Sequence, residues 1–306
     1  MISKLLELEA VLLLLALLGV FLRRCGLIND SGRSFLTDLV TDVILPCNIF
    51  LSFLSTSGGE TLSSSLLTVG MSAVTMIMAA LVGRLLYRGR VHEQSAVFQY
   101  ATTNSNAIFI GLPVIQSLLG GDGVLQLSMY MIFMRLFIWT YGLSLYTGLR
   151  SDKGAAIRKL VAQPAMIAAY LGLAAMLFEL RLPVFVHTVL SDLSGCLMAL
   201  SMLLVGSVLA DIHPRGILRS DIWGFAAVRL VLLPALVLLL CRLLHIPYIV
   251  TATCTLISGM PAASLTAVLA GRYELDTETA SLLVALSTVL SVVTIPVWYL
   301  ILQVLT

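Results

Sequence analysis

Apolar stretches of about 20 residues recur along the whole chain of 306 residues, separated by short polar connections. A helix of about 20 residues spans the hydrocarbon core of a bilayer, where helices satisfy their own backbone hydrogen bonds. Charged residues make up 11% of the chain, against about 25% in a soluble domain. The sequence therefore predicts an all-α polytopic membrane protein. Ten transmembrane helices are expected, at residues 5–22, 35–55, 65–87, 95–119, 124–148, 160–178, 186–210, 219–243, 247–270 and 279–304.

Positive charge is concentrated in alternate loops of this layout. The positive-inside rule places these loops in the cytoplasm and both termini outside it. The other side carries only Lys4, Arg181 and Arg242. The net charge of +2 gives no indication of nucleic-acid binding. The positive residues of the predicted cytoplasmic side are Arg23, Arg24, Arg33, Arg84, Arg88, Arg90, Arg150, Lys153, Arg158, Lys159, Arg215, Arg219 and Arg272.

Two of the apolar segments are interrupted by polar, Gly and Pro residues. The fourth contains Asn104, Asn106, Gly111 and Pro113, and the ninth contains a similar Ser-Gly-Met-Pro run over 258–261. Proline lacks an N–H and disturbs the preceding helical turn, so we expect both helices to break at these prolines. In hydrocarbon a break is tolerated only where protein or a cavity surrounds the freed backbone. Paired broken helices indicate a transporter binding site.

Short matches also relate the two halves of the chain. The Leu-Gly pair at Gly19 has a counterpart at Gly172, and the segment around Asp38 has one around Asp192. Five spans per half is an odd number, so a duplicated second half enters the membrane from the opposite side. We predict a first five-helix repeat at 1–149, a short cytoplasmic linker at 150–159 and a second, inverted five-helix repeat at 160–306.

The chain resembles the auxin efflux carrier family, which includes the plant PIN auxin exporters and many bacterial organic-anion permeases. The matching motifs are Leu22-Arg23-Arg24, Leu45-Pro46-Cys47-Asn48, Gly111-Leu112-Pro113, Met260-Pro261 and Ala270-Gly271-Arg272-Tyr273. The resemblance implies two inverted five-helix repeats whose helices 4 and 9 are broken and cross at mid-membrane, an architecture similar to bile-acid symporters and NhaA-like antiporters. The central loop, about 149–160, is short, which indicates the bacterial type and a bacterial cytoplasmic (inner) membrane.

The broken helices provide the candidate substrate site. Helix N-terminal ends attract anions and C-terminal ends attract cations. Asn106 is the preferred substrate contact because a neutral amide can donate to a carboxylate; the alternative is hydrogen bonding between helices. We expect Asn106→Ala to weaken substrate binding without unfolding the protein. Arg135 and Arg229 lie deep in their spans, where each could pair with an anionic substrate, with Asp42 or with helix-end carbonyls. The full candidate set is Asn104, Asn106, Gly111, Pro113, Arg135, Arg229, Ser258, Gly259, Pro261 and Ser264.

Helix 2 carries the candidate coupling residues. Carboxylates in membrane helices often mark ion routes, so Asp42 is the candidate for proton coupling, with Asn48 beside it. Alternatively, Asp42 lies at the cytoplasmic end in a solvated or Arg-paired position. Tryptophans such as Trp298 are expected to face lipid or the membrane interface.

These features predict a secondary transporter that moves a small organic anion by alternating access, with the lipid bilayer as its surroundings. A sodium-coupled symporter is one alternative, for which Thr102, Thr103 and Ser258 offer oxygens; a channel is another. No catalytic motif indicates an enzyme, the five scattered cysteines indicate neither a disulfide nor a metal site, and no cofactor is expected. A homodimer remains an open alternative.

Overall fold

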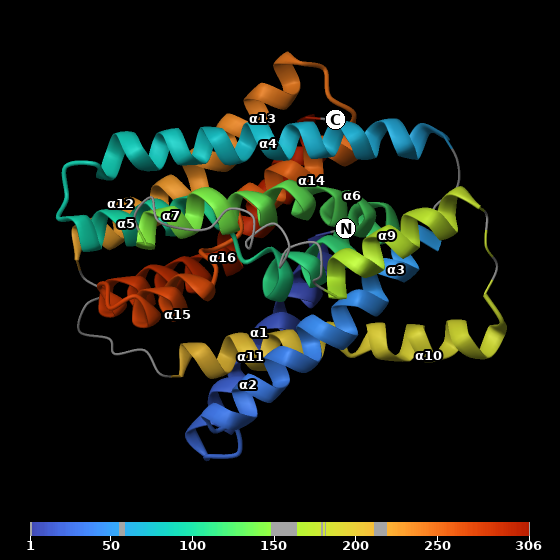
Figure 1. Ribbon diagram of the computed structural model, residues 1–306, viewed down its shortest axis with the longest axis horizontal. Helices are drawn as coiled ribbons and strands as arrows, with labels where there is room; N and C mark the ends of the chain where they lie inside the picture. Colours follow the sequence, from blue (N-terminus) through green and yellow to red (C-terminus); the bar gives the residue numbers. More distant parts are fainter. Residues whose placement is uncertain are drawn as a thin grey trace. The chain divides into compact units, whose positions relative to one another are not determined.

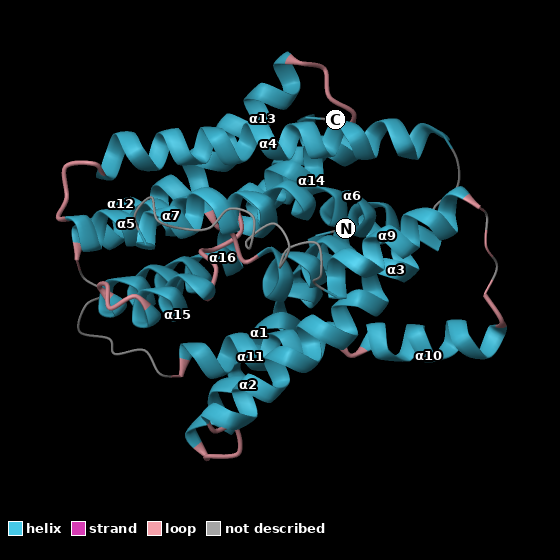
Figure 2. Ribbon diagram, in the orientation of Figure 1, coloured by secondary structure: helices cyan, strands magenta, loops and turns pink. Residues whose placement is uncertain are grey.

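The computed structural model describes residues 2–54, 59–147, 164–178, 180, 182–210 and 219–305, and this part of the chain consists of helices joined by short loops, without a strand (Figures 1 and 2). Its first half contains α1 (Ile2–Arg24), α2 (Asp30–Leu39), η1 (Val40–Ile44), α3 (Leu45–Leu54), α4 (Gly59–Tyr87), α5 (His92–Thr103), η2 (Ala107–Gly111), α6 (Leu112–Phe137), η3 (Ile138–Gly142) and α7 (Leu143–Thr147). Its second half contains α9 (Pro164–Leu177), α10 (Val184–Gly195), α11 (Leu197–Leu209), α12 (Ser220–Ala227), η6 (Val228–Leu232), α13 (Leu233–Leu243), α14 (Tyr248–Ser258), α15 (Leu265–Arg272) and α16 (Thr277–Leu305).

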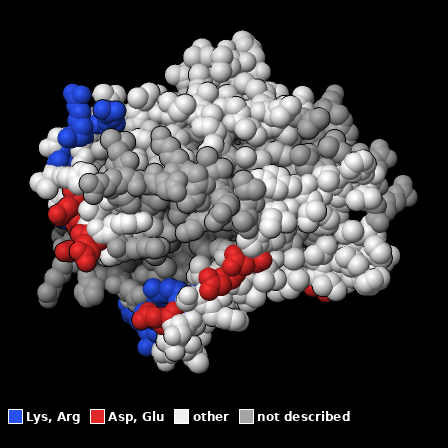
Figure 3. Space-filling view, in the orientation of Figure 1, with Lys and Arg blue, Asp and Glu red and all other residues white. Residues whose placement is uncertain are grey.

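Several of these helices have the length and composition of membrane spans. Six stretches among the described residues qualify: Asp30–Leu51, Ser63–Tyr87, Ala107–Tyr146, Val184–Leu209, Ser220–Leu243 and Thr277–Leu305. On the face drawn in Figure 3, the Lys, Arg, Asp and Glu side chains form small clusters and most of the described surface is uncharged. The protein is therefore an α-helical membrane protein, as predicted. The expected count of ten spans stays a prediction.

The chain forms two compact units, each assembled from separated segments. Unit 1 comprises Met1–Ser65, Ile108–Ser128 and Lys159–Asp211, and unit 2 comprises Leu66–Ala107, Met129–Arg158 and Ile212–Thr306. Each unit thus takes segments from both halves of the sequence. The predicted linker at 150–159 lies outside the described residues.

Within unit 1, α1 and α11 approach each other at two glycines. A methyl group at Gly206 would overlap the Ala16 carbonyl, and one at Gly19 would overlap the backbone of Leu203. Close approach of helix backbones through small residues is a general way of packing membrane helices, which have no hydrophobic drive to associate in lipid. At one end of this pair, Arg33 donates to the Ser207 carbonyl over 2.9 Å.

Three π-helical turns in the chain share one sequence feature, a Leu-Pro pair that follows immediately. The turns are η1, η2 and η6, and the prolines are Pro46, Pro113 and Pro234. In η1 and η6 the residue before the proline, Leu45 or Leu233, donates to the carbonyl five residues back. Proline has no N–H and its ring clashes with the carbonyl four residues back. A widened turn accommodates that ring without ending the helix.

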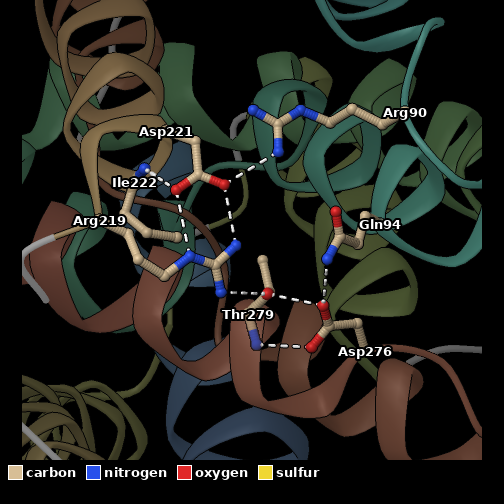
Figure 4. Close-up of polar contacts among 7 residues, drawn as sticks. All are labelled: Arg90, Gln94, Arg219, Asp221, Ile222, Asp276 and Thr279. Atoms are coloured by element: carbon tan, nitrogen blue, oxygen red, sulfur yellow. Dashed lines mark hydrogen bonds and ion pairs between the residues drawn. The ribbon is translucent and has the colours of Figure 1, made fainter. Parts of the chain in front are cut away.

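Polar side chains tie together the N-terminal ends of α5, α12 and α16 in unit 2 (Figure 4). Asp221 accepts from Arg90 over 2.9 Å and from Arg219 over 2.8 Å. Arg219 also donates to the Thr279 hydroxyl. Asp276 caps α16 by accepting from the Thr279 N–H, and accepts from Gln94 over 3.2 Å. The hydrogen bond to Asp221 is the largest cause of the raised pKa of Arg219. We call this cluster the end network; its members are Arg90, Gln94, Arg219, Asp221, Asp276 and Thr279.

The opposite end of unit 2 is defined by the other end of α16. Arg242, in the last turn of α13, donates to the Leu305 carbonyl. Gln303 donates to the hydroxyl of Tyr248, the first residue of α14, over 2.6 Å. Helix α5 therefore begins at one end of unit 2, and α14 begins at the other.

Candidate functional site

Helices α5 and α14 are each too short to cross a bilayer. Helix α5 has 12 residues and α14 has 11, which correspond to about 18 and 16 Å, roughly half of a 30 Å hydrocarbon core. Since they begin at opposite ends of unit 2, their C-terminal ends meet in its interior. This confirms that the fourth and ninth apolar segments are interrupted.

The two chain segments after these helices pair with each other as an isolated antiparallel bridge. The bridge joins Ser105 and Ala262. The N–H of Asn106 donates to the Pro261 carbonyl over 2.8 Å, and the N–H of Ala263 donates to the Asn104 carbonyl over 3.0 Å. These bonds satisfy backbone groups that a broken helix would otherwise leave unpaired in an apolar interior.

A side chain of α16 fixes the depth of this pairing. The N–H of Ala262 donates to the Ser287 hydroxyl over 3.1 Å, and Ser287 is fully buried. Ser287 lies ten residues, or about 15 Å, into a helix of 29 residues. The pairing therefore sits in the middle part of unit 2, away from both of its ends.

One expectation about the first break was wrong. The chain leaves the helix at Asn104–Asn106 and is helical again from Ala107, six residues before Pro113. Pro113 is the second residue of α6, where η2 accommodates its ring. The break is set by pairing with the segment that contains Pro261, rather than by the nearest proline. In the second segment, by contrast, Pro261 does lie in the break between α14 and α15.

Arg229 connects the two helix ends. Its Nε donates to the Met260 carbonyl over 2.9 Å, and its Nη1 donates to the Thr102 carbonyl over 2.5 Å. The residue is 1% exposed, and Nη2 has no hydrogen-bond partner among the described residues. The last carbonyls of a helix have no partner within it and carry partial negative charge. The guanidinium thus neutralises the ends of both α5 and α14.

The end network sets the register that brings Arg229 to Thr102. Gln94 is eight residues before Thr102 in α5, and Asp221 is eight residues before Arg229 in the continuous helix formed by α12 and η6. Equal spacings of about 12 Å along two helices tied together at their N-terminal ends place the two residues at the same depth. The network (Figure 4) therefore positions the site from a distance.

Pro234 adds a further polar contact beside the crossing. Its missing N–H would have bonded the carbonyl of Leu230 four residues back. That carbonyl accepts instead from the indole Nε1 of Trp298 over 2.7 Å. Trp298 is buried in unit 2, so the expectation that it faces lipid or the interface was wrong. A methyl group at Gly259 would contact both the Pro234 ring and the Trp298 ring at 3.5 Å, so this part of the site is closely packed.

The two candidate asparagines have different surroundings. Asn104 is fully buried, and neither its Oδ1 nor its Nδ2 has a hydrogen-bond partner among the described residues. The hydroxyl of Tyr100, one turn earlier in α5, is likewise buried without a described partner. Asn106 is also buried, but unlike Asn104 it is not left without an interaction. Unpaired buried amides are costly, so Asn104 is the stronger candidate for a ligand contact.

The hydroxyl groups near the helix ends donate to their own helices. Thr102 donates to the Phe98 carbonyl, Thr103 to that of Tyr100, and Ser258 to that of Thr255. Ser264 is the N-cap residue of α15, without a side-chain capping bond.

The remaining candidates lie elsewhere. Gly111 and Pro113 belong to the segment of unit 1 that follows the break. Arg135 is buried in the part of α6 that belongs to unit 2. Asp42, in η1 of unit 1, is exposed and accepts from the hydroxyl of Thr41. Asn48, also in unit 1, is buried and donates to the Ser194 hydroxyl over 2.6 Å and to Gln116 over 3.2 Å.

Sequence reasoning missed Ser287, Trp298 and the end network. The signal for Trp298 is Pro234 in α13, because a proline inside a membrane helix implies an open carbonyl that needs a donor. Nothing in the sequence marks Ser287, which looks like any helical serine. Among the described residues no cluster of His, Cys, Asp or Glu could hold a metal ion.

The fold and the helix-end pairing define a polytopic α-helical membrane protein with discontinuous helices. The family described as "Membrane transport protein" matches residues 5–299. The chain belongs to this auxin efflux carrier-like family of transporters. It is similar to the uncharacterized transporter MJ1031 of Methanocaldococcus jannaschii, with 25% identity over 94% of this chain and 96% of the relative. It is also similar to an uncharacterized transporter of Methanothermobacter thermautotrophicus, with 28% identity over 94% of each chain.

Proposed function

We propose that this protein is a secondary transporter that carries a small organic anion, such as a carboxylate, across the cytoplasmic membrane. The observation that carries the proposal is the meeting of α5 and α14 inside unit 2, with a buried guanidinium and an unpartnered amide beside it. Half-length helices that end inside a membrane protein are typical of carrier binding sites. Membership of a transport family supports the same conclusion.

The preference for an anion rests on the donors available at the helix ends. The Nδ2 of Asn104, the hydroxyl of Tyr100 and the Nη2 of Arg229 are buried donors without a described partner. Among the described residues, no carboxylate forms an ion pair with Arg229. A carboxylate can accept from several donors at once, and in a low-dielectric site such bonds are strong.

Alternating access, the ten-helix inverted repeat and the location of both termini outside the cytoplasm belong to this proposal. The division of the chain supports the repeat, because both units draw on both halves of the sequence. Four arginines lie at the end of unit 2 that carries the end network, as a cytoplasmic end requires. They are Arg84 in the last turn of α4, Arg88 and Arg90 in the α4–α5 connection, and Arg219 just before α12.

The test is flux into proteoliposomes that contain the purified protein, with a panel of radiolabelled mono- and dicarboxylates. A carrier gives saturable uptake and counterflow, in which internal unlabelled substrate accelerates entry of external label. An unsaturated current with no counterflow would identify a channel and overturn the proposal.

The contact residues are tested with two asparagine variants. Loss of a hydrogen bond to a charged ligand costs about 1.5–3 kcal/mol, so we expect Asn104→Ala to raise the substrate Kd by about 10-fold or more. Asn106→Ala is expected to weaken binding as well. Ser291→Ala is the matched control, because Ser291 is a buried serine of unit 2 whose hydroxyl donates within its own helix and which is not among the candidate contacts. Unchanged binding by Asn104→Ala would show that the amide only fills space.

A further inference from the structure

The two helix ends that meet inside unit 2 have the same electrostatic sign. Each C-terminus carries about −0.5 elementary charge through carbonyls without helical partners. Two such ends repel each other in an apolar interior, where water cannot compensate. A cation between them is therefore needed for α5 and α14 to end against each other. In a carrier this cation is either supplied by solution or built into the chain.

The chain supplies the cation through Arg229. Its guanidinium donates to Met260, two residues after α14 ends, and to Thr102 in the last turn of α5. The side chain is 1% exposed, and no carboxylate among the described residues forms an ion pair with it. An arginine keeps its charge on burial more readily than a lysine. Its charge is therefore available to the helix ends.

The neighbouring oxygens support this assignment. The Thr102 carbonyl is already bonded to the guanidinium, and the hydroxyls of Thr102 and Thr103 are directed to carbonyls of α5. A sodium ion needs several oxygen ligands converging on one point. The Thr102 carbonyl and the hydroxyls of Thr102 and Thr103 are thus each engaged with another protein group.

We propose that Arg229 is a resident cation that takes the place of a mobile coupling cation, so that this carrier works without sodium. The part of this inference that concerns sodium-independent transport rests on the proposed transport function. The part that concerns Arg229 and the two helix ends does not depend on the substrate. Removing the guanidinium frees the carbonyls of Thr102 and Met260 and leaves room for water, so that these oxygens together can coordinate a small cation from solution. Variants at Arg229 therefore gain a dependence on dissolved cations that the natural protein lacks.

Thermal unfolding tests the structural part without a substrate. Cys241 and Cys254 are buried in α13 and α14, whereas Cys25, Cys47 and Cys196 are exposed or half-buried. In a background with the latter three replaced, a thiol-reactive fluorophore reports unfolding of unit 2 alone. The unfolding midpoint of Arg229→Ala is measured in detergent with a low concentration of guanidinium chloride, sodium chloride or lithium chloride. Each salt is compared with choline chloride at equal ionic strength. Arg242→Ala is the matched control, because Arg242 also donates to a helix-end carbonyl but is exposed to solvent.

We expect the unfolding temperature of the natural protein to be the same in every salt, and that of Arg242→Ala likewise not to change with the salt. Arg229→Ala unfolds at a lower temperature and is restored by guanidinium or sodium. At ten times the dissociation constant of the cation, the midpoint rises by about 3–6 °C. A folded Arg229→Ala variant whose midpoint is the same in all salts would overturn the proposal.

A second pair of variants separates charge from hydrogen bonding if the alanine variant does not fold. Arg229→Lys keeps the charge and Arg229→Gln keeps a neutral donor. A resident cation predicts that Lys behaves like the natural protein and that Gln becomes cation-dependent. Equal behaviour of Lys and Gln contradicts it.

Flux measurements test whether transport is independent of sodium. Transport by the natural protein is expected to be the same in sodium and in choline, whereas transport by Arg229→Gln increases severalfold on addition of sodium or guanidinium. Sodium-dependent flux by the natural protein would overturn the inference. Absence of flux for every carboxylate would overturn the proposed function instead, and cation-dependent unfolding of the Arg229 variants would still support the resident cation.

Discussion

Replacing Trp298 tests how the chain compensates for a proline in a membrane helix. The indole Nε1 donates to the Leu230 carbonyl over 2.7 Å at a buried position. Trp298→Phe keeps an aromatic ring but leaves this carbonyl unpaired, which costs about 1–3 kcal/mol. For a protein of this size each kcal/mol lowers the unfolding midpoint by about 2–4 °C. We therefore expect the midpoint to fall by about 2–12 °C, measured through the reactivity of Cys241 and Cys254.

A second substitution separates the hydrogen bond from the loss of ring volume. Pro234→Ala restores an N–H that can donate to the Leu230 carbonyl four residues back. In this background Trp298→Phe removes the same volume but no longer leaves the Leu230 carbonyl without a donor. A double-mutant cycle therefore gives a coupling free energy of about 1–2 kcal/mol between the two positions. A coupling near zero would refute the idea that Trp298 replaces the missing proline donor.

Two further perturbations address the two units separately. Asp221→Asn removes the ion pairs with Arg90 and Arg219 in unit 2. Because these side chains are partly exposed, we expect the free energy of unfolding to fall by about 1 kcal/mol at low salt, which lowers the unfolding midpoint. The difference from the natural protein becomes smaller at high salt, because salt screens the ion pairs that the natural protein keeps. Gly206→Ala places a methyl group against the Ala16 carbonyl in unit 1; overpacking of this kind costs about 1–3 kcal/mol, which circular dichroism would detect as earlier loss of helix.

Each of these predictions has an internal check. Gly195→Ala is the control for Gly206, because an added methyl group there meets no atom within 4 Å. Equal stability of the Gly206 and Gly195 variants would contradict the close approach of α1 and α11. For Asp221, a loss that does not change with salt would show that its role is other than ionic.

The interruption of two helices could be predicted from the sequence, but the position of the first break could not. Glycine and proline are local signals, and they identified both segments correctly. Asn104–Asn106 leave the helix because they pair with residues 261–263, more than 150 positions away. Local propensity contains no information about such a partner. The tolerance of Pro113 just after a π turn is equally a property of the folded helix, which widens where a ring must fit.

The charged candidates show the same division between local and tertiary information. That Arg229 lies deep in a span was evident from its position, and a helix-end role was one of the alternatives considered. Choosing among them required the location of Thr102 and Met260. Asp42 is a coupling candidate because carboxylates are rare in spans, and its side chain is exposed in unit 1, which matches the solvated alternative. A sequence marks an unusual residue but does not reveal whether the fold surrounds it.

The helix ends also narrow the search for the substrate contact. Arg229 bonds the carbonyls of Thr102 and Met260, and the Ser105–Ala262 bridge pairs the backbone on either side of it. With these groups occupied, a buried side chain that still lacks a partner is the one left to act on a ligand, because a fold does not retain such a group without compensation. Among the described residues of α5 and its break, the amide of Asn104 meets this criterion at both of its polar atoms. The backbone and two nitrogens of Arg229 thus hold the helix ends together, while Asn104 and the Tyr100 hydroxyl one turn before it are available for recognition.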